Sequence, residues 1–228
     1  MFEQFAEYFW LALFAALVLY GLANTIQVPF LIKKFYRKKE FEDQGKSTFS
    51  EAPLQNSKLL KGLKTPNVYS GTYRNYKVQQ FAAFSVNRRK LTMNKAIRKN
   101  NQLSWTISVA YLDTELPEFC ARPTKVTESP SYIFDEQGVL FPEDESFVNK
   151  VHVMAGDHAA VRKLFTIYIR ERLTGIDPVS LESLGKVLIY KSPRFPHEAG
   201  TKLEKDLTLL IDMVENIEAT QKTAFEKH

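Results

Sequence analysis

The chain of 228 residues has a formal net charge of +5, 44% apolar residues and one cysteine. One thiol excludes an intrachain disulfide framework and agrees with a reducing compartment. Residues 33–66 hold nine bases and four acids, whereas residues 67–228 are close to neutral with 22 bases and 20 acids. The positive excess therefore lies in one short segment, where it favours contact with an anionic membrane surface over DNA or RNA.

The N-terminal segment, residues 1–32, contains an uncharged and largely apolar run from Tyr8 to Ile32. As a helix this run would be roughly 37 Å long, whereas the hydrocarbon core of a bilayer is about 30 Å thick. We therefore expect a single transmembrane helix over Phe9–Ile26. A cleaved signal peptide would need bases before the run, and only Glu3 and Glu7 stand there. A globular core rarely needs a helix of this length that is apolar on every side.

A basic cluster follows the apolar run. Because Lys and Arg accumulate on the cytoplasmic side of a span, we expect the N-terminus outside and the remaining chain in the cytoplasm. The same bases are candidate contacts for a partner or for anionic lipid: Lys33, Lys34, Arg37, Lys38 and Lys39. Residues 33–66 as a whole are interpreted as a basic juxtamembrane linker. Within it, Leu59, Leu60 and Leu63 form a short apolar patch that can dock on the domain as one helical turn.

The domain at residues 67–220 begins with patterns typical of β-strands. Val68–Tyr73 and Tyr76–Val86 flank the dipeptide Arg74-Asn75 and predict a hairpin. The segment Leu103–Leu112 alternates apolar and small polar residues, which predicts a strand with one core face and one wet or lightly covered face. Further strands are predicted around Phe119, at Tyr132–Phe134, at Phe147–Met154 and at Lys186–Tyr190.

Two amphipathic helices are expected in the last third of the chain. Asp157 is a suitable N-cap for a helix that continues to Leu173. Thr201 and Glu204 form a capping box, and a stripe at helical spacing follows it, comprising Leu203, Leu207, Leu210, Ile211, Val214 and Ile217. Residues 221–228 form a polar tail. The order of elements predicts an α+β domain with a mainly antiparallel sheet and two C-terminal amphipathic helices behind the transmembrane helix.

Three short blocks carry a resemblance to a known family: Gly71-Thr72-Tyr73, Leu116-Pro117-Glu118-Phe119 leading to Arg122-Pro123, and Phe147–Met154 before the Asp157-capped helix. With them, residues 68–218 resemble a bacterial family of uncharacterised membrane-anchored proteins with a cytoplasmic domain. An acidic residue often follows the Arg-Pro pair in that family, and Thr124 stands there in this chain. The resemblance implies a bacterial inner (plasma) membrane location, and it implies no activity or catalytic residues.

Signatures of catalysis and of metal or cofactor binding are missing from the sequence. The glycines match no phosphate-binding loop, and no His or Cys spacing predicts zinc. Cys120 would need a base such as His152, His158 or His197 to act as a nucleophile, so we interpret it as a small residue on a strand. Three acids, Glu143, Asp144 and Glu145, are expected to face water rather than bind a cation. No catalytic, cofactor-binding or metal-binding residue is predicted.

A second basic cluster falls between two predicted strands. Its members are Arg88, Arg89, Lys90, Lys95, Arg98 and Lys99, with no acid among them. Such a loop could contact anionic headgroups, an acidic partner or nucleic acid, or could simply be solvated. Aromatic residues on which bases could stack are missing from it, which disfavours single-stranded nucleic acid.

These patterns favour a membrane-anchored cytoplasmic interaction or regulatory module that contacts a membrane-protein partner or anionic lipid. A membrane-tethered enzyme with an unrecognised active site is the alternative, and a nucleic-acid-binding protein is less favoured. A deep polar pocket containing His152 or Cys120 would indicate the enzyme.

Overall fold

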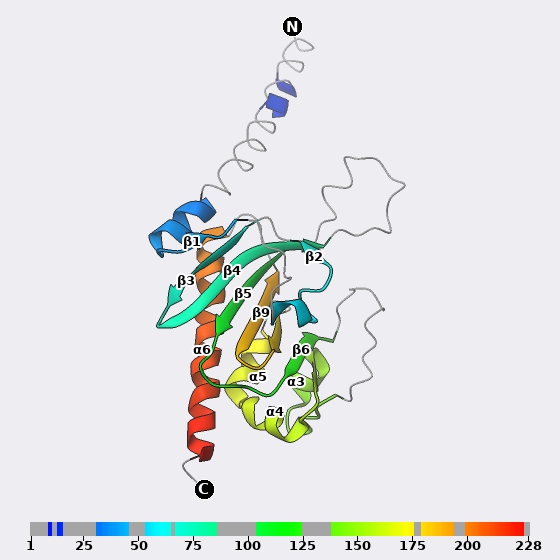
Figure 1. Cartoon of the computed structure of the whole chain (residues 1–228). Helices are drawn as coiled ribbons and strands as arrows, with labels where there is room; N and C mark the ends of the chain where they lie inside the picture. Colours follow the sequence, from blue (N-terminus) through cyan, green and yellow to red (C-terminus); the bar gives the residue numbers. More distant parts are fainter. Residues whose placement is uncertain are drawn as a thin grey trace.

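A computed structural model of the chain contains one antiparallel sheet with helices packed on one of its faces (Figure 1). It describes residues 9–10, 13–15, 31–45, 53–64, 67–85, 104–124, 138–175, 179–193 and 199–225. The strands run in the order β1-β3-β4-β5-β9-β8-β6-β7, and β2 pairs with β4. Their bounds are β1 Glu42–Asp43, β2 Leu63–Lys64, β3 Val68–Tyr73, β4 Tyr76–Ser85, β5 Ser104–Tyr111, β6 Phe119–Pro123, β7 Val151–Ala155, β8 Ser180–Ser183 and β9 Val187–Pro193.

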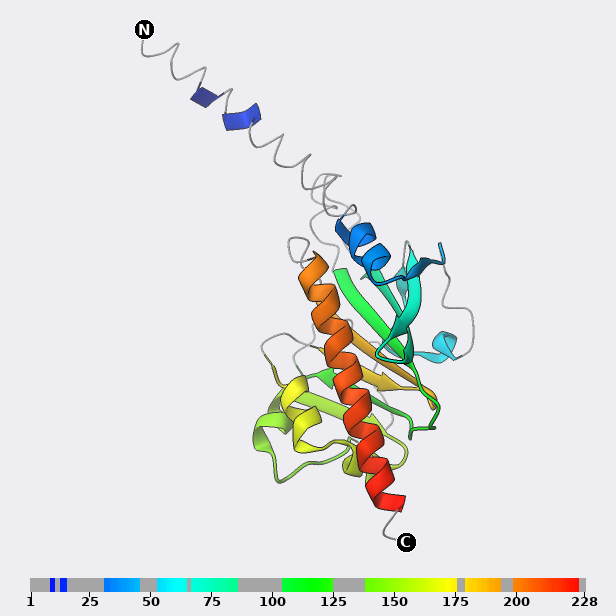
Figure 2. The ribbon, with the colours of Figure 1, turned by 90° about the vertical axis from the view of Figure 1, so that its left-hand side faces the viewer.

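Helices cover one face of this sheet. They are α3 Glu145–Lys150, α4 His158–Leu164, α5 Ile167–Leu173 and α6 Ala199–Phe225. Helix α6 runs along the length of the sheet, with α4 and α5 beside it (Figure 2). Residues 31–38 are also helical, and a short 3₁₀ turn occupies Leu54–Asn56. The α+β class and the antiparallel sheet predicted from the sequence are therefore confirmed.

Both faces of the sheet are buried. On β5, Ile107 and Val109 face one core and Ala110 faces the other, and all three are fully buried. The core beneath the helices is the larger, and the opposite one is packed beneath residues 54–63. The predicted docking of Leu59 and Leu60 is confirmed, because both are buried in this second core. Tyr36 and Phe41 also belong to the larger core, so the packed unit includes residues before the first hairpin.

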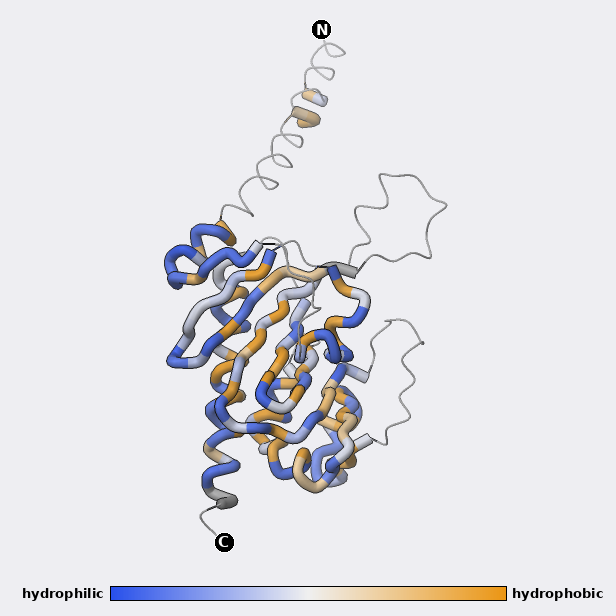
Figure 3. The backbone as a smooth tube through the Cα atoms, viewed as in Figure 1, coloured by the Kyte–Doolittle hydropathy of each residue, from blue (hydrophilic) through white to orange (hydrophobic). Residues whose placement is uncertain are grey.

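Helix α6 confirms its predicted apolar stripe. Every member of the stripe is buried against the sheet, and polar residues alternate with it along the helix (Figure 3). The helix begins at Ala199, so Thr201 lies inside its first turn rather than at the N-cap.

Two other predicted elements are corrected. The run Phe147–Met154 is not one strand, because Asp144 accepts a hydrogen bond from the Phe147 amide and caps α3 before β7 begins at Val151. The helix predicted from Asp157 to Leu173 is two helices, since Thr166 caps a new one. The strand predicted at Tyr132–Phe134 lies outside the described residues.

No helix among the described residues is both long and apolar enough to cross a membrane. Helix α6 has the length, with 27 residues, but it carries charged residues beside its apolar stripe. This finding corrects the prediction of an N-terminal single transmembrane helix. It also corrects the predicted localisation, which was a single-pass inner-membrane protein with its N-terminus outside and its domain in the cytoplasm. Of the predicted span Phe9–Ile26, all but residues 9–10 and 13–15 lie outside the described residues.

Candidate interaction surface

Residues 31–38 form an amphipathic helix that presents a basic face to solvent. Tyr36 is buried and Ile32 and Phe35 are partly buried against the larger core. Side chains on the other side of the helix are exposed, and four of them are cationic: Lys33, Lys34, Arg37 and Lys38. Positions separated by three or four residues lie on one side of a helix, so the four cations form one patch. We call these four residues the basic face.

Aromatic contacts fix this helix to the sheet. The Tyr36 ring stacks on the ring of Tyr69 in β3, with centroids 3.8 Å apart and planes 12° apart. Its hydroxyl donates a hydrogen bond of 3.1 Å to Gln80 Oε1 in β4. The Phe41 ring also stacks on Tyr36, with centroids 5.8 Å apart. The basic face therefore has a defined orientation on the domain, because the opposite side of its helix is part of the core.

Lys39, a member of the predicted cluster, makes specific contacts with described residues of the domain. Its ammonium donates to Glu204 Oε1 in α6 at 2.6 Å and lies 5.5 Å from the centre of the Tyr73 ring. This hydrogen bond lowers the pKa of Glu204. Lys39 therefore links the end of the helix at residues 31–38 to α6, whereas the side chains of the basic face are exposed to solvent. The predicted contacts Arg88, Arg89, Lys90, Lys95, Arg98 and Lys99 lie outside the described residues.

Gly71 in β3 makes room for the segment that carries the basic face. A Cβ atom at Gly71 would lie 2.5 Å from Cδ1 of Phe41, which is buried. We expect Gly71→Ala to displace Phe41 and lower the free energy of unfolding by about 1–3 kcal/mol, the usual cost of overpacking. Gly156→Ala is the matched control, because a Cβ there meets nothing within 4 Å. Equilibrium urea unfolding measures both, and equal midpoints would contradict the prediction.

Cys120 lies on a strand, as the sequence analysis interprets it, and its environment does not favour a nucleophile. Cys120 in β6 is 1% exposed, and burial raises the pKa of its thiol to about 11. Its sulfur accepts a hydrogen bond of 3.3 Å from Arg122 Nε. The thiol is therefore protonated at neutral pH, and the thiolate is the nucleophilic form. His152 is exposed on the edge strand β7, and its ring packs over Gly138.

Asp157 caps α4 as predicted, accepting a hydrogen bond from the Ala160 amide at 2.9 Å. Within the described ranges, no group of three or more His, Cys, Asp or Glu residues is placed to hold a metal ion.

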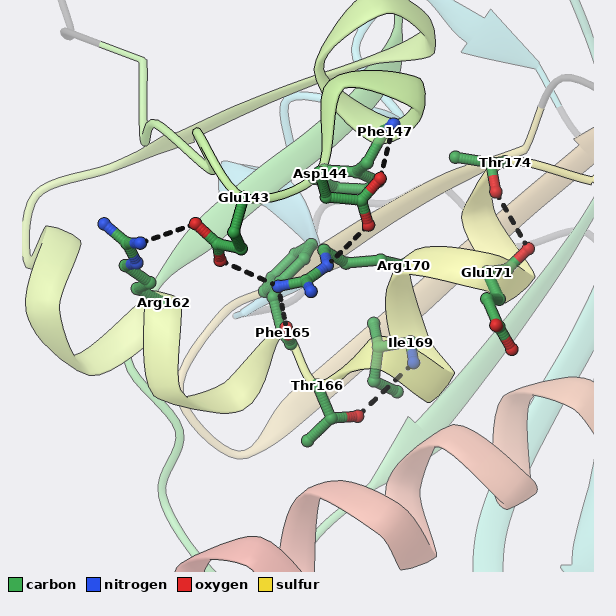
Figure 4. A network of polar contacts seen from close by, with 10 residues as sticks. All are labelled: Glu143, Asp144, Phe147, Arg162, Phe165, Thr166, Ile169, Arg170, Glu171 and Thr174. Carbon is green, nitrogen blue, oxygen red and sulfur yellow. Dashed lines mark hydrogen bonds and ion pairs between the residues drawn. The ribbon is translucent and has the colours of Figure 1, made fainter.

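Two of the three acids that were expected to face water, Glu143 and Asp144, hold an arginine, whereas Glu145 is exposed as predicted. Arg170 in α5 donates to Asp144 Oδ2 at 2.9 Å, to Glu143 Oε1 at 3.2 Å and to the Phe165 carbonyl at 3.2 Å (Figure 4). Arg162 in α4 donates to the other oxygen of Glu143 at 2.6 Å. This network joins α3, α4 and α5 and gives these residues a structural role.

A second buried polar cluster lies between α6 and the sheet. Asp206 in α6 is 1% exposed and accepts a hydrogen bond of 2.6 Å from Ser192 Oγ in β9. The Lys202 ammonium lies 3.7 Å from its other oxygen. Burial raises the pKa of Asp206 to about 6, although Ser192 and Lys202 act in the opposite direction. In the sequence this buried cluster is visible only as a carboxylate near the apolar stripe. A carboxylate at that position is equally typical of the exposed edge of a helix.

Comparisons with known proteins show the fold but no family. No protein-family model and no curated protein sequence matches the chain. Among solved structures, the chain is similar to the crystal structure of the mycobacterial trehalose monomycolate transport factor A, TtfA. The TM-score is 0.56 with 10% sequence identity, over 86% of this chain and 96% of that chain. The resemblance to bacterial membrane-anchored proteins is therefore supported only as far as a fold shared with a bacterial protein.

Proposed function

We propose that the domain is a protein-interaction module that binds an acidic surface of a partner protein through its basic face. The observation that supports this proposal is the exposure of Lys33, Lys34, Arg37 and Lys38 on a helix whose other side is buried. Four cations held in one orientation attract an acidic patch and fix the register of a complex. The similar fold of a transport factor is consistent with an interaction role.

A charge-matched pair of variants tests the basic face. The first carries Lys33→Gln, Arg37→Gln and Lys38→Gln, with a photo-crosslinking residue in place of Lys34. The control carries the same crosslinker and instead Lys77→Gln, Lys186→Gln and Lys222→Gln, which are exposed bases elsewhere on the domain. Both variants lose the same charge, so any difference between them reports the location of the charge rather than its total.

The proposal predicts one protein adduct in cells that express the control variant, and at least a tenfold weaker adduct with the basic-face variant. Rising salt should weaken the contact, because exposed charges are screened over about 10 Å at 0.1 M salt. Equal adducts in the two variants would contradict the proposal. Binding only to vesicles of anionic lipid would contradict it too, and would assign the basic face to headgroups. The segment Arg88–Lys99 stays a predicted second contact, which a parallel neutralised variant tests.

A further inference from the structure

Residues 53–64 cross the face of the sheet opposite to α6, and we call them the strap. They consist of the 3₁₀ turn Leu54–Asn56, a turn at residues 57–62 and the two residues of β2. Leu59 and Leu60 are 4% and 2% exposed and pack into the second core with residues of the central strands. Before β2, side-chain packing and polar contacts hold the strap to the sheet.

One buried carboxylate binds the middle of the strap. Glu182 in β8 is 1% exposed. Its oxygens accept hydrogen bonds from the Ser57 hydroxyl, from the Lys58 amide at 2.7 Å and from the Leu59 amide at 3.1 Å. A carboxylate that accepts consecutive main-chain amides resembles the cap of a helix N-terminus. Glu182 therefore recognises a hydroxyl group and two backbone amides rather than a particular long side chain.

Arg122 in β6 completes this recognition from the neighbouring strand. Its guanidinium donates to the Lys58 carbonyl at 3.1 Å and to Cys120 Sγ at 3.3 Å. Glu182 and Arg122 together thus bind both the amide and the carbonyl of residue 58. Apolar positions for two consecutive leucines follow immediately. Chemically this is a site for a short peptide.

The groove continues beyond the strap. A hollow of about 400 Å³ lies at the ends of β6, β7 and β8, beside the turn. Lys58, Glu182 and Cys120 line it, so it adjoins the peptide contacts, and Met154 and Leu184 supply apolar walls. The strap therefore occupies only part of the available groove.

We propose that this groove is a peptide-binding site, which the chain's own Ser57–Leu60 occupies, and that a partner peptide with a hydroxyl residue two positions before a pair of leucines competes for it. Glu182 and Arg122 bind the peptide backbone, the second core accepts the leucines, and the hollow accommodates residues beyond them. The site is on the opposite face of the sheet from α6 and does not depend on the role of the basic face.

Hydrogen exchange in the unaltered full-length protein tests whether the strap can leave the groove. A segment that opens locally exchanges faster than the core and with little dependence on denaturant. We expect the amides of Lys58 and Leu59 to exchange at least about 100-fold faster than those of Ile107 and Val109 in β5. Exchange of all four amides at one rate, with the same dependence on urea, would show that the strap opens only on global unfolding and would overturn the proposal.

Competition by a synthetic peptide of residues 53–64 tests recognition. Ser57→Ala with Leu59→Ala weakens the strap and leaves the groove intact. The labelled peptide should bind this variant at least tenfold more tightly than it binds a variant that also carries Glu182→Gln. A peptide with alanine at both positions is the control ligand. The single cysteine gives a second readout, because the wild-type peptide should slow modification of Cys120 in the strap variant.

Equal peptide affinities of the strap variant and of the variant that also carries Glu182→Gln would overturn the proposed peptide site. A rate of Cys120 modification that does not change when the peptide is added would also overturn it. Circular dichroism shows whether Ser57→Ala with Leu59→Ala unfolds the domain. The exchange experiment on the unaltered protein then decides whether the strap is a separable ligand or an integral part of the core.

Discussion

Arg170→Ala is expected to lower the free energy of unfolding by about 2–3 kcal/mol. The guanidinium is 10% exposed and satisfies Asp144, Glu143 and the Phe165 carbonyl at once. It also lies 5.5 Å from the centre of the Phe141 ring, so alanine removes packing as well as charge. Removing one partner from a fully buried ion pair costs about 3–5 kcal/mol. The expected value is smaller because Glu143 is 43% exposed and water can solvate it.

Arg162→Ala is the matched control for this network. It removes a contact to the same carboxylate, but Arg162 is 48% exposed, and exposed ion pairs contribute less than about 1 kcal/mol. Arg170→Lys should fall between the two, because an ammonium keeps the charge and cannot reach the three acceptors in the geometry of a guanidinium. Urea unfolding compares the three variants. Equal losses for Arg170→Ala and Arg162→Ala would show that Arg170 is not the centre of the network.

Asp206→Asn is expected to stabilise the domain above pH 6 by up to about 3 kcal/mol. In the folded protein the pKa of Asp206 is raised from 3.8 to about 6, chiefly by burial. The folded state therefore binds a proton more tightly than the unfolded state does. The stability that this protonated carboxyl contributes is fully present below pH 3.8, and it is lost as the pH rises through about 6. Asparagine keeps the shape and an acceptor for Ser192 but has no charge to bury, so the variant avoids this loss.

The measurement is the difference in stability between wild type and Asp206→Asn from pH 4 to pH 8. Taking the difference cancels the titration of the other carboxylates. Glu204→Gln is a control of opposite sign when the range is extended below pH 4, because the pKa of Glu204 is lowered from 4.5 and its stabilising charge is lost only as the pH falls below that value. A difference between wild type and Asp206→Asn that does not change with pH would show that the Asp206 carboxylate is neutralised or solvated in another way.

Patterns with a clear period allowed most of the sheet and α6 to be predicted. The hairpin around Arg74-Asn75 was predictable because two runs of β-forming residues flank a dipeptide. In the structure both residues of the dipeptide adopt positive φ, a conformation that asparagine tolerates. The strand β8 was missed because its sequence, Ser180–Ser183, has one apolar residue and no alternation that marks a core face. The break between α4 and α5 was missed because Phe165 continues the apolar spacing, whereas Thr166 starts a new helix with its side chain.

The cluster of bases could be recognised in the sequence, whereas its place on a helix packed against the domain and the positions of the buried charges could not. Glu182, Arg170 and Asp206 look like surface residues in the sequence because charged side chains are almost always exposed. Their partners are distant along the chain, as with Ser57 and Glu182, and only the folded topology brings them together. The role of Lys39 was not predictable for the same reason, since its partner is Glu204 in the last helix.

The position of α6 in the chain sets the order in which the protein can fold. Synthesis delivers every strand of the sheet before Ala199–Phe225, yet residues such as Leu207 and Ile211 complete the larger core. The part of this face that α6 covers therefore stays exposed until that helix has been synthesised. Contacts as distant as Lys39 with Glu204 also delay closure, because long loops form slowly. During that interval the nascent chain is a natural client for a chaperone that binds apolar surface.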